Sequence, residues 1–173
     1  KLEKKIPLVK KTLIDEKKVI ELLEKIKLIA SGTDNAARKS IDLTKEILQK
    51  AEASITNPDK KKRFQFLQLA LSADEATRDG FFESLKDSKN REKESWVLSA
   101  LGYINHPLRQ ESSIKHLKTS LELLEEIQLT GDIFFPKAWL DAGFSGHRSA
   151  PAAEVIRRYL ETHPDFPGDL RLK

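Results

Sequence analysis

The sequence predicts an all-α fold in which antiparallel helix pairs stack as an α-solenoid of about seven to nine helices. Two observations predict it. Apolar residues recur at helical spacing in almost every segment, and no segment alternates between apolar and polar residues as a half-buried strand does. Several of these segments are also apolar on two sides, which requires a neighbour on each side. No repeat of fixed length is visible, so the solenoid prediction depends on helix pairing alone.

Two helices are predicted in the first third of the chain. Residues 15–30 begin at a capping Asp15 and end near Gly32, and an apolar stripe runs along one face: Val19, Leu22, Leu23 and Ile26. Residues 35–53 form the second helix, whose apolar side carries Ala37, Ile41, Leu48 and Ala51.

The next two helices are predicted from their start signals. Asn57 followed by Pro58 is typical of a cap and a first helical residue, so a helix is expected over 58–71. The stretch SADE at 72–75 has the pattern of a capping box, in which Ser72 caps a helix and Glu75 reaches back. That helix carries Phe81, Phe82 and Leu85.

Two further helical segments follow. Residues 89–104 are apolar on two sides and are expected to be buried between neighbours. Residues 107–129 have apolar residues at helical spacing and are either one long helix or two. Together with the preceding helices they form a single domain over 1–173, without an internal boundary.

The segment 130–149, TGDIFFPKAWLDAGFSGHRS, is unlike the rest of the chain. Gly131 is expected to end a helix in the left-handed conformation, and Phe135 to be extended because it precedes proline. Pro136 opens a short helix that Gly143 ends, and Ser149 caps a last helix over 150–162. The aromatic residues of the segment are expected to plug the end of the stack, or to pack on a part of the molecule outside this chain: Phe134, Phe135, Trp139 and Phe144.

Composition excludes several classes of protein. The chain has no Cys, which removes disulfides, thiol catalysis and Cys-ligated zinc, and it has no run long enough to span a membrane. Its net charge of +4 is uneven, since residues 1–63 carry 17 basic and 10 acidic side chains. Most of these lysines alternate with acids, which favours solvated helix faces over a nucleic-acid surface. Both cytoplasmic and periplasmic locations stay open, and the missing initiator Met indicates a fragment of a larger chain.

A search for catalytic motifs predicts no catalytic residue, no metal ligand and no cofactor in this chain. There are 4 His, but no H-E-x-x-H, no phosphate-binding glycine loop and no G-x-S-x-G elbow. Candidate residues of a chamber or interface surface are His106 and Arg109 at the start of 107–129, with His147 and Arg148 before the last helix. Either arginine can attract a peptide carboxylate, or form a structural salt bridge. The alternative for His106 and Arg109 is that they satisfy local carbonyls or an acid on the next helix.

Several stretches resemble a known family. The segment SLELLEEIQLTGDIFFPKAWLDAGFSGHRS, together with FLQLALSAD, NREKESWVLSALGYINHPLR and PDFP, resembles the C-terminal helical domain of bacterial aminopeptidases of the aminopeptidase N family. The resemblance covers 57–173 and is weak over 1–56. The motifs are structural and include no catalytic residue.

The resemblance implies a HEAT-like helical domain of a zinc metallopeptidase. In that family the zinc site lies in an upstream catalytic domain, and the C-terminal domain packs on it and walls the chamber that holds the peptide substrate. The implied partners are thus the catalytic domain of the same chain and a peptide, and zinc is implied for the parent enzyme only. The alternative is a free-standing α-solenoid scaffold that binds a protein or nucleic acid through its basic N-terminal third.

Overall fold

The computed structural model describes residues 34–168, with side chains from residue 41 onward. These residues form nine α-helices and two 3₁₀ helices, and they include no β-strand, so the all-α prediction is confirmed. The helix predicted over 15–30 lies outside them. The elements are α2 (Asp34–Ser54), α3 (Pro58–Leu71), α4 (Glu75–Ser84), η2 (Ser88–Arg91), α5 (Glu94–Ile104), η3 (Pro107–Arg109), α6 (Gln110–Ser113), α7 (His116–Glu122), α8 (Leu124–Thr130), α9 (Phe135–Phe144) and α10 (Ala150–Thr162).

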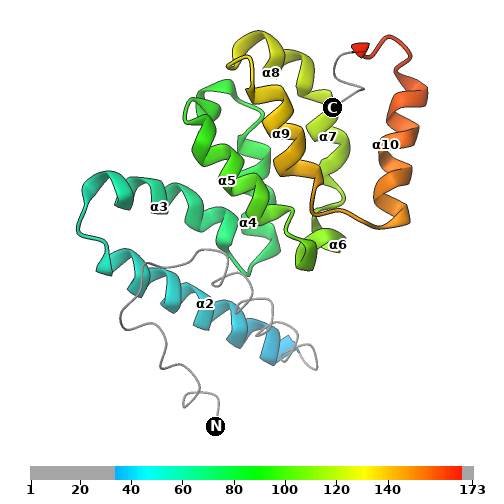
Figure 1. Ribbon diagram of the computed structural model, residues 1–173. Coiled ribbons are helices and arrows are strands. Elements are labelled where there is room, and N and C mark those ends of the chain that lie inside the picture. The colour runs from blue at the N-terminus through cyan, green and yellow to red at the C-terminus, as the bar shows by residue number, and fades with distance from the viewer. Residues whose placement is uncertain (1–33, 169–173) are drawn as a thin grey trace.

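The helices form a row from α2 at one end to α10 at the other (Figure 1). Helix α2 packs on α3, α3 packs on α4 and α5, and α5 packs on α9. Helix α9 in turn contacts α7 and α8, and α7 contacts α10. The row agrees with stacked helices, while the regular superhelix of a solenoid stays a prediction.

Helix α5 occupies the centre of this row. It carries buried apolar residues on both sides, with Val97 and Leu101 fully inaccessible, because α3 covers one side and α9 the other. Trp96 and Leu98 are half-buried. The expectation for 89–104 is therefore confirmed for the helical part. Trp139 of α9 is also fully buried, and its indole Nε1 donates a hydrogen bond to the carbonyl of Ser120 at 3.2 Å.

Two predicted helix caps are confirmed. The Asn57 side chain accepts hydrogen bonds from the backbone N–H groups of Asp59 and Lys60, both at 3.0 Å. The Ser149 side chain accepts one from the N–H of Ala152 at 3.3 Å. In each case the cap satisfies a backbone donor that has no partner within the helix.

The capping box predicted at 72–75 is wrong in its details. Helix α4 begins at Glu75 with Asp74 as its cap, and the Asp74 carboxylate accepts from the N–H of Thr77 at 3.1 Å. The Ser72 hydroxyl instead accepts from the N–H of Asp74 at 3.1 Å and holds the turn before the helix. The hydrogen bonds from Thr77, its side chain first, lower the pKa of Asp74.

Two long predicted helices are interrupted. Residues 89–104 divide into η2 and α5, because the backbone of Lys93 between them is not helical, with φ −97° and ψ 69°. Arg91 at the end of η2 turns inward and donates to the carbonyls of Leu85 and Lys86. Residues 107–129 divide into η3, α6, α7 and α8, more pieces than either alternative allowed. Their junctions stay close to helical, as at Leu123 with φ −80° and ψ −12°, so the chain bends without reversing.

The segment 130–149 departs from expectation at two positions. Gly131 has φ −94° and ψ 175°, so it is extended and not left-handed. It is glycine for lack of space, since a Cβ there would lie 2.7 Å from the Phe135 ring and 2.9 Å from the carbonyl oxygen of Ile127. Phe135 is not extended but opens α9, where its buried ring packs edge-on against Trp139 one turn later, with ring centroids 6.0 Å apart.

Candidate functional site

Arg109 is 2% exposed and ties three segments together. Its guanidinium donates to the carbonyls of Ala70 at 2.8 Å and Leu71 at 3.2 Å, which are the last two residues of α3. It also reaches the carbonyls of Ser72 and Tyr103, both at 3.4 Å. Carbonyls at a helix end lack partners within the helix and carry partial negative charge, so a buried cation is well placed there.

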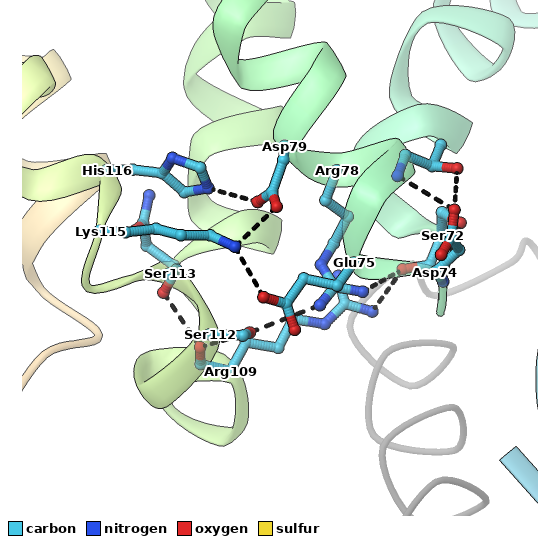
Figure 2. Close-up of polar contacts among 12 residues, drawn as sticks. Ser72, Asp74, Glu75, Arg78, Asp79, Arg109, Ser112, Ser113, Lys115 and His116 are labelled. Carbon is cyan, nitrogen blue, oxygen red and sulfur yellow. Dashed lines mark hydrogen bonds and ion pairs between the residues drawn. The ribbon is translucent and has the colours of Figure 1, made fainter. Parts of the chain in front are cut away.

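A second buried arginine lies beside it. The guanidinium of Arg78 donates to the carbonyl of Ser72 at 2.7 Å and that of Ala73 at 2.9 Å, so Arg78 and Arg109 share one acceptor (Figure 2). Arg78 also reaches the hydroxyl of Ser112 in α6 at 3.4 Å. The two arginines thus fasten the α3–α4 turn to the η3–α6 segment.

A cluster of charged groups joins α4 to α7 on the same side of the molecule (Figure 2). Lys115 contacts the carboxylates of Glu75 and Asp79, each at 2.6 Å, and His116 hydrogen-bonds Asp79 at 2.9 Å. The His116 ring stacks on Phe82 with ring centroids 4.2 Å apart. Burial lowers the pKa of His116 although Asp79 opposes the shift, and the hydrogen bonds that Lys115 donates to Asp79 and Glu75 raise the pKa of Lys115.

His147 lies in a tight junction between α9 and the end of α5. Its Nε2 hydrogen-bonds the amide oxygen of Asn105 at 3.0 Å and approaches the hydroxyl of Ser113 at 3.4 Å. Its Nδ1 is buried and makes no hydrogen bond among the described residues, and burial lowers the pKa of the ring. The adjacent Gly146 lies against the carbonyl of Asn105, which a Cβ would meet at 1.6 Å.

The four predicted surface residues do not form one site. Arg109 belongs to the interior, and His147 is half-buried in the junction just described. His106 caps η3, because its Nδ1 accepts from the N–H of Leu108 at 3.3 Å. Arg148 alone is exposed, and its backbone N–H donates to the side chain of Gln110 at 3.3 Å.

The predicted aromatic plug is only partly internal. Phe135 is 3% exposed, Trp139 is fully buried, and Phe144 is half-buried against the core. Phe134, however, is 77% exposed, together with Leu129 at 86% and Ile133 at 80%. Leu129 lies in the last turn of α8, and Ile133 and Phe134 lie in the connection from α8 to α9. We call these three residues the apolar turn.

A cavity of about 370 Å³ lies beside the apolar turn, between η2 and the start of α9. It is lined by Ser88, Lys89, Arg91, Glu92, Glu94, Thr130, Gly131 and Phe135. A second, open groove of about 520 Å³ runs along α10, next to Ile156 and Leu160.

The described side chains do not form a binding site for the zinc that the family resemblance implies for the parent enzyme. Over the part of the chain that the structure describes, no group of three His, Asp or Glu residues is placed to hold a metal ion. Within the same residues, no helix is both long enough and apolar enough to cross a lipid bilayer.

Several of these features have only weak sequence signals. The inward-facing Arg78 and Arg91 look like ordinary members of charged helices, and the contact between His116 and Asp79 joins residues 37 positions apart. The apolar turn had a partial signal, because IFF is more apolar than a linker requires.

Compared with known proteins, the chain matched no family model, no curated protein and no solved structure.

Proposed function

We propose that this chain is the non-catalytic C-terminal helical domain of a bacterial zinc metallo-aminopeptidase of the aminopeptidase N family. In this proposal it packs on the catalytic domain of the same polypeptide and walls the chamber that holds the peptide substrate. The zinc and the reaction belong to that catalytic domain, since this sequence has no H-E-x-x-H.

One observation carries the proposal. The segment with the clearest family resemblance, 130–149, supplies the fully buried Trp139 and at the same time leaves Ile133 and Phe134 exposed. Adjacent exposed apolar side chains on an ordered turn are typical of a surface that another folded unit covers. A domain that docks on a larger enzyme needs such a surface, whereas a helical body that acts alone does not.

Arg148 is the predicted arginine with an exposed side chain, since Arg109 is internal. Within this proposal Arg148 can attract the carboxylate of a bound peptide. The alternative function is a scaffold that binds a protein or nucleic acid through the basic residues 1–63, of which 1–33 lie outside the described residues.

The test compares two proteins in one assay. The 173-residue chain and the complete polypeptide encoded by its gene are each given zinc and an aminoacyl anilide. We expect no turnover from the chain and zinc-dependent turnover from the complete polypeptide. Turnover by the chain alone, or a complete polypeptide that is inactive with zinc, would contradict the proposal.

A further inference from the structure

Hydrogen bonds from backbone N–H groups order the backbone of the apolar turn. The N–H of Gly131 donates to the carbonyl of Ile127 at 2.8 Å, and the N–H of Asp132 donates to the Glu94 carboxylate of α5, also at 2.8 Å. The Asp132 side chain then accepts from the N–H of Phe134 at 2.9 Å. The exposed side chains therefore stand on an ordered backbone, and a partner that binds them has little loop ordering to offset.

The surroundings of the apolar turn are acidic. Residues 119–136 contain no Lys or Arg, and they contain four acids: Glu122, Glu125, Glu126 and Asp132. Glu92 and Glu94 line the neighbouring cavity. Three cations near the turn are ion-paired: Arg91 with Glu126, Lys118 with Glu122, and Lys137 with Asp141. Lys89 lies on the cavity wall and Lys93 is exposed between Glu92 and Glu94, so the acids still outnumber the cations. We call Glu125, Glu126 and Asp132 the acidic rim.

The acidic rim and the apolar turn together indicate which kind of binding partner fits this surface. An anionic lipid surface or a nucleic acid would be repelled by the acidic rim. A second copy, paired through the same turn, would bring two acidic rims together, which costs free energy. A protein surface with an apolar hollow bordered by Lys or Arg is complementary in both respects.

We propose that the apolar turn docks into an apolar hollow bordered by basic side chains on another folded unit of the same polypeptide. The identity of that unit as the catalytic domain rests on the proposed function above. Three side chains are fewer than the 20–30 residues that a stable interface buries on each side, by roughly a factor of seven to ten. They form the central anchor of that interface, with the acidic rim at its border.

A photo-cross-linking experiment on the complete encoded polypeptide tests this inference. Phe134→benzoylphenylalanine places the probe in the apolar turn, and Leu108→benzoylphenylalanine provides the control, since Leu108 is 57% exposed on η3. We expect irradiation to join position 134 to a segment of the same polypeptide outside this chain that contains Lys or Arg. Position 108 is expected to give only background.

Charge reversal supplies a second readout. Glu125→Lys should lower the cross-link yield at position 134, while Glu161→Lys on the exposed end of α10 should leave it unchanged. Raising the salt concentration should also lower the yield, because the contribution of the acidic rim is screened. An effect of Glu161→Lys as large as that of Glu125→Lys would contradict the charge argument.

The remaining outcomes separate the inference from the function. A cross-link between two copies, or none in a polypeptide that hydrolyses the anilide, would overturn the docking surface and leave the proposed function intact. A cross-link to a basic hollow in a polypeptide without peptidase activity would support the surface and overturn the function. Binding of the 173-residue chain to anionic phospholipid vesicles that Phe134→Ser abolishes would also overturn the inference.

Discussion

The guanidinium of Arg109 donates a 2.8 Å hydrogen bond to the carbonyl of Ala70, and thereby joins η3 to the end of α3 across 39 positions of sequence. The acceptor is a helix-terminal carbonyl with no partner inside its own helix. The contact therefore adds a long-range cap to the local one, in which the N–H of Ser72 donates to the carbonyl of Leu69, and the stability of the α3–α4 turn depends on a residue far along the chain.

Replacement of Arg109 should be costly. We expect Arg109→Leu to lower the free energy of unfolding by about 3 kcal/mol or more, because several buried carbonyls lose their donor. Arg109→Lys should recover part of this loss, since one ammonium cannot reach all four carbonyls. Urea unfolding followed by circular dichroism measures both. Arg148→Lys, at an exposed site, is the control and should be neutral; equal effects at both sites would contradict the structure.

Two glycines should respond in opposite directions to the same substitution. Gly146→Ala should lower the free energy of unfolding by about 2 kcal/mol or more, because its Cβ would collide with the carbonyl of Asn105. Gly102→Ala should raise it by about 0.5–1 kcal/mol, because Gly102 lies inside α5 and a Cβ there meets nothing within 4 Å. Thermal unfolding of the two variants checks the prediction. An unchanged free energy of unfolding in Gly146→Ala would contradict the close contact between Gly146 and the carbonyl of Asn105.

Adjacent phenylalanines should also differ. Phe135→Ala should cost about 3–5 kcal/mol, since its ring is buried against Trp139. Phe134→Ala should change the free energy of unfolding of the 173-residue chain by less than about 0.5 kcal/mol, because its ring is in solvent. Urea unfolding of the two variants compares them directly, and a large loss for Phe134→Ala would place that ring in the core.

The histidines predict how stability depends on pH. Burial lowers the pKa of His116 and of His147 in the folded chain, so the unfolded chain binds more protons at pH values just below its own histidine pKa. The contribution of these two histidines to the free energy of unfolding is therefore fully present above their pKa in the unfolded chain. It is lost as the pH falls from that value through their lower pKa in the folded chain. The melting temperature should be lower at about pH 5.5 than at about pH 7.5.

A histidine variant isolates this effect. His147→Gln keeps an amide donor near Asn105 but cannot titrate, so its melting temperature should fall less between the same two pH values. The unchanged chain, measured at the same two pH values, is the control. The same fall in His147→Gln as in the unchanged chain would rule out this role for His147.

Local sequence signals predicted most helix positions. The Asn57 and Ser149 caps and the two-sided burial of α5 follow from patterns within a few residues, and the structure confirms them. The failures come from long-range contacts. Nothing near Arg91 indicates that its side chain turns inward, and nothing in the pair Phe134–Phe135 indicates which ring is buried. The turn before these rings is bonded to Glu94, whose carboxylate accepts from the N–H of Asp132, 38 residues away.

The same reasoning applies to the candidate site. His106, Arg109, His147 and Arg148 were grouped by position near helix ends, and helix ends are where cations satisfy carbonyls as well as bind ligands. Arg109 donates to buried carbonyls at the end of α3, and His147 lies half-buried against Asn105. Exposed fraction cannot be read from residue type, which is why the apolar turn was expected to be at least partly a plug.

The most direct test of the central claim is product analysis of a peptide treated with the complete polypeptide encoded by the gene. If the chain is the C-terminal domain of a zinc aminopeptidase, mass spectrometry should show stepwise removal of N-terminal residues, lost with a chelator and restored by zinc. The 173-residue chain alone should leave the same peptide intact. Internal cleavage, no cleavage by the complete polypeptide, or N-terminal trimming by the chain alone would contradict the account.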